Sequence, residues 1–434
     1  MDKEINEICL LNDSFPPAID GVANTVVNYG RVIQNEGCDV SVVTPEFPGS
    51  DDSNFSYPVI RYPSIDLRKF CGYTAGNPFS ISVQEEIAKR DISLLHSHCP
   101  IMSNILAREL RDRLNVPFIM TYHTKFDVDI SNAIRGKILQ EGAIKALVES
   151  VSACDELWVV SRGAGENIKG LGYRGDYVIM ENGVDMQKHR VSDDEILSVT
   201  QGYDLPDNLP VFLFVGRLMW YKGIRIILDA LAALKSQNLD FRMVFVGSGM
   251  DEASIKSCCR DLMLEDKCIF TGALHERETL AAWYCRADLL LFPSTFDTNG
   301  LVVREAAACS LGSVLVRGSC AAEGVTDREN AFLIDENAAS LAVCLATVME
   351  NKEKMHQVGS NAADTLYISW DDSIKKAIDR YGTVIDNYKS GLYEKHRGLT
   401  EDLFIIEADL LNMHERLSQH RKNLSEFLDL TYFN

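Results

Sequence analysis

The stretch Val211-Phe212-Leu213-Phe214-Val215-Gly216-Arg217 (VFLFVGR, residues 211–217) decides the fold, because a short apolar run that ends in a loop is typical of a buried strand. Four similar runs follow, separated by helical material, at 242–246, 268–271, 288–292 and 313–316. Strands that alternate with helices predict a parallel sheet with helices on both faces. The sequence therefore predicts a doubly wound, Rossmann-like α/β domain.

The half of the chain before this stretch has the same alternation. An apolar run at 5–11, a turn-rich stretch, an amphipathic segment and a run at 39–43 predict one βαβ unit. Further short runs are at 94–97, 118–122, 157–161 and 177–180. We expect two domains, residues 1–190 and 191–368, joined by a linker near 186–208. Ligands lie outside the carboxyl ends of such strands, so two facing sheets would hold a ligand in the cleft between them.

The last part of the chain departs from this scheme. Residues 370–388 predict one long helix, and a helical tail follows over 391–434. Residues of the tail recur at the spacing of a heptad seam that one histidine interrupts: Leu403, Ile406, Leu410, Met413, Leu417, His420, Leu424 and Phe427. Two interpretations stay open, a short coiled coil that forms a homodimer and a helix that packs on its own chain.

Composition excludes several classes of protein. Hydrophobic residues make up 46% and charged residues 24% of the 434 residues, as in globular proteins. No apolar run approaches the roughly 18 residues of a membrane-spanning helix, and the N-terminus does not resemble a signal peptide. The 12 cysteines have no regular spacing, which indicates reduced thiols, and the formal charge of −20 would repel nucleic acid. We expect a cytoplasmic protein that does not bind nucleic acid.

Two acids follow the fourth predicted strand of the second domain. Asp297 lies in the run FPSTFDTNGL (292–301) after the strand, and Glu305 lies in the helix that follows. Both can face the same ligand, and a carboxylate is suited to accept hydrogen bonds from a ribose diol. A glycine and the free amides of a helix start favour close contact with an anion. The candidates for such contacts are Asn299, Gly300 and Leu301. An acid that only stabilises the helix dipole is the structural alternative.

Two cations belong to the same predicted sheet edge. Arg217 ends the first strand of the second domain and Lys222 begins its first helix. A planar guanidinium and a compact ammonium together suit a diphosphate, although each is also common at protein surfaces. Gly247, at the end of the second strand, leaves room for a base or ribose. In the first domain, the amides around Gly21 begin a helix and could hold a phosphate.

One histidine is a candidate for substrate binding. His123 follows the strand at 118–122, where an imidazole can contact a sugar hydroxyl, and a structural histidine is the alternative. The run His96-Ser97-His98-Cys99 suggests a metal, but adjacent strand positions alternate faces and no second cluster has metal-site spacing. We therefore expect no metal site. Asp127 and Asp129 are interpreted as loop acids.

Together these residues resemble glycosyltransferase family four, a family of retaining enzymes with the GT-B architecture, over about residues 8–385. That family has two acids, ordinarily both glutamates, separated by seven residues; here the pair is Asp297 and Glu305. Its N-terminal signature usually contains a double glycine, where this chain has Asp20-Gly21. Three motifs look most like the branch that glycosylates diacylglycerol-type lipids: Asp20-Gly21-Val22, Thr121-Tyr122-His123-Thr124 and Asp297-Thr298-Asn299-Gly300.

The resemblance implies a role for each candidate. Glu305 would hold the ribose hydroxyls, and Arg217 and Lys222 the diphosphate. Asp297 and the amides of 299–301 would bind the transferred sugar, which His123 would contact from the first domain. The first domain would be the acceptor side and the second would bind the nucleotide sugar. A helix at 369–390 would cross back to the first domain.

The implied reaction moves a hexose from a nucleotide-diphosphate sugar, most often a UDP-sugar in this family, to an acceptor hydroxyl. No carboxylate of the first domain is placed as a nucleophile, so we expect front-face attack with retention, without a metal ion or any cofactor besides the donor. Lipid and soluble glycan acceptors both stay open. A candidate for peripheral membrane contact is the segment 131–151, with Arg135, Lys137 and Lys145 among its cations. The alternatives are a sugar-nucleotide epimerase and a catalytically silent, dimerising scaffold.

Overall fold

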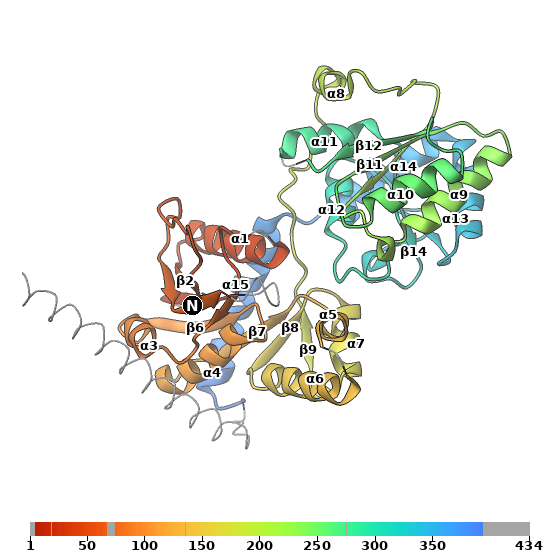
Figure 1. Ribbon diagram of the computed structural model, residues 1–434. Helices are drawn as coiled ribbons and strands as arrows, with labels where there is room; N and C mark the ends of the chain where they lie inside the picture. Colours follow the sequence, from red (N-terminus) through yellow and green to blue (C-terminus); the bar gives the residue numbers. More distant parts are fainter. Residues whose placement is uncertain (1–4, 19, 67–73, 135, 275, 394–434) are drawn as a thin grey trace, which may run out of the picture. The chain divides into compact units, whose positions relative to one another are not determined.

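The computed structural model describes residues 5–18, 20–66, 74–134, 136–274 and 276–393 (Figure 1). These residues form two compact units. Unit 1 comprises the described parts of Met1–Val159, Gly165–Ile179 and Ile374–Asn434, and unit 2 comprises those of Val160–Ala164 and Met180–Ser373. The predicted heptad tail lies outside the described residues from 394 onward.

Unit 1 contains a seven-stranded parallel sheet in the order β3-β2-β1-β6-β7-β8-β9. Its strands are β1 (Glu7–Leu11), β2 (Asp39–Pro45), β3 (Val59–Tyr62), β6 (Ile92–Ser97), β7 (Phe118–Tyr122), β8 (Glu156–Val159) and β9 (Tyr177–Ile179). A separate antiparallel pair joins β4 (Ser64–Asp66) to β5 (Thr74–Gly76). The strand order reverses between β1 and β6, as in doubly wound folds.

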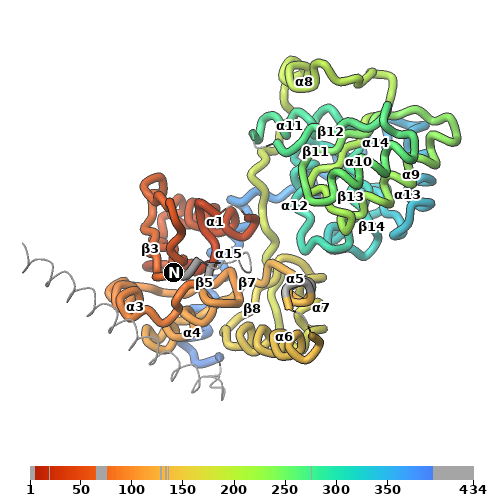
Figure 2. Tube along the Cα trace, in the orientation of Figure 1, coloured from red at the N-terminus to blue at the C-terminus, as the bar shows by residue number. Residues whose placement is uncertain are grey.

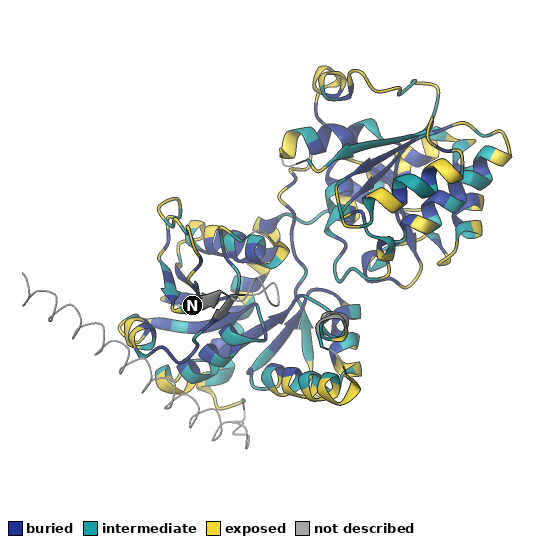
Figure 3. Ribbon diagram, in the orientation of Figure 1, coloured by how far each residue is buried: buried dark blue, intermediate teal, exposed yellow. Residues whose placement is uncertain are grey.

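Helices cover both faces of this sheet. They are α1 (Gly21–Asn35), α3 (Ile81–Ile87), α4 (Met102–Leu114), α5 (Phe126–Ala133), α6 (Lys137–Val151), α7 (Arg162–Gly170) and α15 (Trp370–Lys389). Helix α1 connects β1 to β2, toward one edge of the sheet, and α4 connects β6 to β7, toward the other edge. Because both connections are right-handed, these two helices lie on opposite faces of the sheet. Most residues of the inner strands are buried, those of the edge strand β9 are of intermediate burial, and the outer sides of the helices are exposed (Figure 3).

The segment 131–151, the candidate for membrane contact, comprises parts of α5 and α6. Gly136 separates them with a φ of 103°, a conformation that ends a helix and that glycine adopts without strain. Lys137 and Lys145 lie on α6, where each pairs with a glutamate one turn further on, at 3.9 Å.

The long C-terminal helix α15 confirms the helix predicted at 370–388, and most of it belongs to unit 1. The Tyr381 hydroxyl lies 2.6 Å from His96 Nδ1, and its ring stacks on Trp158 with centroids 5.3 Å apart. Arg380 pairs with Glu156 at 2.5 Å. The last described helix is therefore part of the core of the unit that begins the chain.

Unit 2 contains a six-stranded parallel sheet in the order β12-β11-β10-β13-β14-β15. Its strands are β10 (Val211–Val215), β11 (Arg242–Val246), β12 (Cys268–Gly272), β13 (Leu289–Phe292), β14 (Ser313–Val316) and β15 (Phe332–Ile334). Together with the sheet of unit 1, this sheet confirms the predicted pair of Rossmann-like domains.

The helical elements of unit 2 are α8 (Asp193–Thr200), η1 (Trp220–Lys222), α9 (Ile224–Ser236), α10 (Glu252–Asp261), α11 (Arg277–Arg286), α12 (Leu301–Ala308), η2 (Cys320–Ala322), α13 (Ala338–Met349) and α14 (Lys352–Thr365). The expected linker at 186–208 lies inside unit 2. It contains α8, which begins with a capping box between Ser192 and Glu195 and packs against α11. The chain contributes Val160–Ala164 to unit 2, continues in unit 1 and passes to unit 2 again after Ile179.

Candidate active site

The expected ligand-binding residues of unit 2 gather where the strand order reverses. Strands β10 and β13 are neighbours, and the chain continues from them toward opposite edges of the sheet. Figure 2 traces the chain of this unit, with β11, β12, β13 and β14 labelled. Ligands of doubly wound sheets lie outside the carboxyl ends of the strands at this reversal. Arg217 and Lys222 follow β10, and Asp297 follows β13. The structure therefore brings both expected cations and one expected acid to a single sheet edge.

Glycines allow the loops at this sheet edge to pack closely against one another. Gly247 has a φ of 135°, and a Cβ on it would lie 2.0 Å from the Gly216 carbonyl oxygen. Gly223 has a φ of 78°, and a Cβ there would lie 2.3 Å from the Pro293 carbonyl oxygen. Both positions require glycine because of the backbone conformation and because of the contact. The loops after β10, β11 and β13 thus form one closely packed platform.

Lys222 and Asp297 form the central ion pair of the platform. Lys222 Nζ donates to Asp297 Oδ1, and the second carboxylate oxygen accepts a 2.5 Å hydrogen bond from the Ser294 hydroxyl. The Lys222 side chain is 10% exposed and that of Asp297 is 21% exposed. An ammonium ion can donate three hydrogen bonds, so Lys222 can hold this carboxylate and still donate to a bound anion.

Arg217 differs from Lys222 in exposure. Its side chain is exposed at the carboxyl end of β10, and its guanidinium makes no ion pair with any residue of the described ranges. A guanidinium with this freedom can adopt the geometry of two phosphate oxygens. The expectation that Arg217 and Lys222 act as a pair on a diphosphate remains a prediction.

The loop before α12 offers hydrogen-bond donors. Gly300 caps α12 with a φ of 60°, and a Cβ there would lie 2.7 Å from Ala321 Cβ. The helix begins at Leu301, so the first amides of α12 lack partners within the helix. Asn299 Nδ2 is buried without a hydrogen-bond partner in the described part of the chain. Such a donor is expensive to bury unless a ligand accepts from it.

Glu305, the second expected acid, has a different set of partners. Its carboxylate accepts from the Tyr284 hydroxyl at 2.9 Å and from Arg277 at 3.2 Å, and Arg277 also binds Asp185 at 2.9 Å. The side chain is 12% exposed. Burial raises the pKa of Glu305, while the Tyr284 hydrogen bond and the Arg277 charge lower it to a smaller extent. Asp297 and Glu305 are thus held by separate networks, and the sequence had not identified Tyr284, Arg277 or Asp185.

His123 belongs to a buried cluster of three histidines in unit 1. Its Nε2 lies 3.0 Å from His98 Nδ1, and the two rings stack with centroids 5.3 Å apart. The His96 ring lies 4.0 Å from that of His98, and its Nε2 is 2.7 Å from the Thr121 hydroxyl. The signal was present in the sequence, since His96 lies on β6, and His98 and His123 directly follow the neighbouring strands β6 and β7.

Burial keeps these histidines uncharged. It lowers the pKa of His123 to about 3, and it lowers those of His96 and His98 well below their ordinary value of 6.5. A neutral His123 can exchange a hydrogen bond with a hydroxyl but brings no positive charge. His98 Nε2 is buried without a partner among the described residues.

The first loop of unit 1 differs from the expected phosphate site. Gly21 begins α1, but the Asp20 carboxylate accepts from the amides of Val22 and Ala23 at 2.8 and 2.7 Å. These two amides are therefore already occupied by an acid, which would also repel a phosphate.

A buried acid in the same loop was not assigned a role from the sequence. Asp13, which is 3% exposed, accepts from the amides of Met102 and Ser103 at the start of α4, at 3.0 and 2.6 Å. It therefore joins the loop after β1 to the helix after β6, on either side of the strand reversal in unit 1.

The metal-like motifs have other structural roles. The interpretation of Asp127 and Asp129 as loop acids is wrong, because both lie on α5. Asp127 accepts from the Asn167 side chain at 3.2 Å. Within the described ranges no group of three histidines, cysteines or acids has a geometry that could hold a metal ion.

Comparison with known proteins confirms the family resemblance. Residues 19–188 match the family model described as Glycosyltransferase Family 4, and residues 199–365 match that of Glycosyl transferases group 1. The alpha-monoglucosyldiacylglycerol synthase of Streptococcus pneumoniae is 23% identical over 69% of each chain. The enzyme of the same name from Acholeplasma laidlawii is 22% identical over 82% of this chain and 91% of its own.

A solved structure has the same fold. The Anabaena protein Alr3699/HepE in complex with UDP-glucose superimposes with a TM-score of 0.68 at 17% identity, over 87% of this chain and 99% of that chain. No helix in the described ranges is long and apolar enough to cross a membrane.

Proposed function

Because the chain belongs to glycosyltransferase family four and has the GT-B fold, it is a glycosyltransferase, and we propose that it transfers a hexose from a UDP-sugar to a hydroxyl of a glycerolipid with retention of configuration. The observation that carries the proposal is the Lys222–Asp297 pair at the strand reversal of unit 2. It combines a cation for the leaving diphosphate with an acid for the transferred sugar.

The donor assignment rests on the platform of unit 2. Lys222 and the exposed Arg217 supply positive charge for the diphosphate, and Gly247, whose Cβ position is filled by the Gly216 carbonyl oxygen, holds the loops after β10 and β11 together. Glu305 accepts hydrogen bonds from the ribose hydroxyls. Asn299 Nδ2, a buried donor, binds the hexose or a phosphate oxygen. The choice of a UDP-sugar is supported by the UDP-glucose complex of the Anabaena protein.

In the proposed reaction, the bond between the anomeric carbon and the diphosphate oxygen breaks while the acceptor oxygen bonds to the same face of that carbon. The departing phosphate oxygen takes the proton of the acceptor hydroxyl. Lys222 and Arg217 stabilise the charge that develops on the diphosphate, and each such donor is worth about 100-fold in rate or more. The neutral His123 of unit 1 exchanges a hydrogen bond with a sugar hydroxyl. No metal ion is required, so turnover should persist in EDTA.

The acceptor assignment rests on the relatives and on α6. Both curated relatives described above are named alpha-monoglucosyldiacylglycerol synthases. On α6, the side chains of Ile138 and Leu139 are 85% and 64% exposed, directly after the exposed Lys137. Exposed aliphatic side chains beside a cation favour the surface of an anionic membrane. We propose that α6 contacts that surface peripherally.

Product analysis tests the function. Purified protein is incubated with UDP-glucose and diacylglycerol in vesicles that contain anionic lipid, with GDP-mannose as the matched donor control. An alpha-linked glycolipid, identified by the anomeric coupling in its proton spectrum, is the expected result. A beta-linked glycolipid would contradict retention. A new nucleotide sugar without any glycoside would favour an epimerase instead.

The residues beyond the described range offer one additional test. We propose that the heptad seam at 403–427 pairs two copies of the chain. Light scattering of the full chain and of a chain that ends at Tyr393 should give the mass of a dimer and of a monomer, respectively. Equal masses would contradict this pairing.

A further inference from the structure

An apolar groove of about 340 Å³ lies in unit 1 between α4, α5 and α6. Aliphatic and aromatic side chains form most of its wall, and Arg108, Glu149 and Ser150 are the polar residues that line it. The apolar residues used in the argument are Ile101, Ile105, Phe126, Ile130, Ala143 and Leu147.

The groove begins at the same sheet edge as the polar candidates of unit 1. Phe126 lies three residues after His123, which follows the carboxyl end of β7. Ile101 precedes α4, just after the carboxyl end of β6. An apolar chain in the groove would thus begin close to the segment that carries the hydrogen-bonding histidine.

The groove also continues to the exposed apolar surface of α6. Leu139, Ala143 and Leu147 follow one another at spacings of four residues, so they lie on one face of the helix. Leu147 is buried, Ala143 is partly buried and Leu139 is 64% exposed. The apolar stripe therefore runs from the interior of unit 1 to its surface, where the outer side of α6 is exposed in Figure 3.

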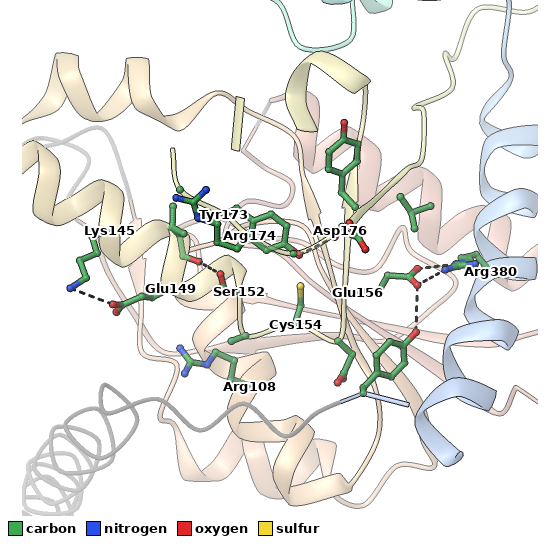
Figure 4. A pocket seen from close by; sticks show the side chains of 18 residues that line it. Arg108, Lys145, Glu149, Ser152, Cys154, Glu156, Tyr173, Arg174, Asp176 and Arg380 are labelled. Carbon is green, nitrogen blue, oxygen red and sulfur yellow. Dashed lines mark hydrogen bonds and ion pairs between the residues drawn. The ribbon is translucent and has the colours of Figure 1, made fainter. Parts of the chain in front are cut away.

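A larger cavity of about 1030 Å³ in the same unit has a different character (Figure 4). It lies at the amino ends of β8 and β9, away from the edge that carries His123. Its lining is rich in charge that is already paired: Arg380 binds Glu156 at 2.5 Å, and Lys145 lies 3.9 Å from Glu149. This lining is unsuited to a hydrocarbon, whereas the groove between α4, α5 and α6 is suited to one.

We propose that this groove binds an alkyl chain of the acceptor lipid and so makes the enzyme select acceptors by their hydrocarbon. The inference rests on the proposed function, which supplies the lipid acceptor. The chain enters beside Leu139, lies along Ala143 and Leu147 and ends with its polar head near the segment that follows His123. Each methylene that leaves water for such a groove raises affinity about 4-fold.

The test uses water-soluble acceptors, 1-alkylglycerols from butyl to decyl below their micelle concentrations, so that membrane binding plays no part. With the wild-type chain, kcat/KM should rise about 4-fold per methylene until the groove is full. Ala143→Phe, which fills the groove, should make the series nearly flat. Glu141→Phe introduces the same side chain at an exposed position of α6 that does not line the groove, and should keep the wild-type slope.

Two results would overturn different claims. An Ala143→Phe variant with the wild-type chain-length slope would reject the groove as the alkyl site while glycoside still forms. Failure of the wild-type chain to glycosylate any alkylglycerol or diacylglycerol would instead reject the proposed function. Wild-type circular dichroism and retained turnover of butylglycerol verify that unit 1 of each variant is folded.

Discussion

Lys222 donates to Asp297, a residue 75 positions later in the chain, across the junction of the loops that follow β10 and β13. A hydrogen bond joins this cation and this acid at the strand reversal, on a platform where Gly223 and Gly247 allow the loop backbones to come into direct contact. Because the pair is largely shielded from water, the charge of either partner acts on a ligand with little screening.

Replacement of Asp297 should damage turnover more than donor binding. Asp297→Asn keeps the shape and can still accept from Ser294, but it removes the negative charge that orients Lys222. We expect kcat to fall about 100-fold, with a much smaller change in the donor KM. Steady-state kinetics measures both. Asp229→Asn, which breaks the exposed pair with Arg225 on α9, is the matched control and should behave as wild type. A variant at 297 with normal kcat would remove Asp297 from the site.

Arg217→Ala should lower turnover without loss of stability. The side chain is exposed, so its removal leaves no buried partner unsatisfied, whereas the diphosphate loses a bidentate donor. We expect a fall in kcat of about 100-fold and an unchanged melting temperature. Arg225→Ala, another exposed arginine of the same unit, serves as the control. If both variants keep wild-type kinetics, Arg217 does not contact the leaving group.

The raised pKa of Glu305 leads to a prediction of how donor affinity depends on pH. Burial raises its pKa above the ordinary value of 4.5, and the ribose hydroxyls need the ionised form. Donor affinity should therefore be constant at high pH and fall as the pH drops through this raised pKa. Calorimetric titration with UDP from pH 8 downward measures the effect.

Glu305→Gln provides the matching variant. It should bind UDP about 10-fold more weakly than wild type at neutral pH and lose the acid-side decline. Since the folded-state pKa is raised, protonation of Glu305 favours the folded state, and its contribution to stability is lost as pH rises through that pKa. The glutamine variant should thus be no less stable than wild type at pH 7. An unchanged pH profile would exclude Glu305 as the titrating group.

The histidine cluster predicts acid sensitivity of unit 1. The folded-state pKa of His123 is about 3, and those of His96 and His98 are also lowered, so the unfolded chain binds more protons below its histidine pKa of about 6.5. Stability should fall as the pH drops from 6.5, by up to about 1.4 kcal/mol per pH unit for each histidine. Urea unfolding at several pH values measures how the free energy of unfolding depends on pH. This dependence should be weaker in His123→Gln than in His189→Gln, a surface control.

The sheet of unit 2 was predictable because parallel strands buried on both faces are continuous apolar runs. The runs at 211–215, 242–246 and 313–316 correspond at both ends to β10, β11 and β14. Strands β3 and β15, which contain four and three residues and lie at sheet edges, were not predicted. The equally short edge strand β9 was predicted from the apolar run at 177–180, so length alone does not explain the difference.

The sequence predicted the positions of site residues that lie next to a strand in the chain. It did not predict contacts that depend on how helices pack against one another. Arg217 and Asp297 lie in the loops that follow β10 and β13, so the strands alone place them at the sheet edge. The partners of Glu305 could not be foreseen, because Tyr284 and Arg277 reach it only through the rotation of α11 against α12. The occupied amides after Asp20 follow from a rotamer that places its carboxylate over the helix start.

The insertion of α15 into the core of unit 1 also determines the order in which a growing chain can fold. Unit 2 is almost continuous in sequence and is complete once residue 373 has left the ribosome. Unit 1 begins at the N-terminus, yet its Trp158 and His96 have no Tyr381 to pack against until nearly the last described residues have been made. The part of the protein that is synthesised first can therefore complete its core only after the whole of unit 2 has been made.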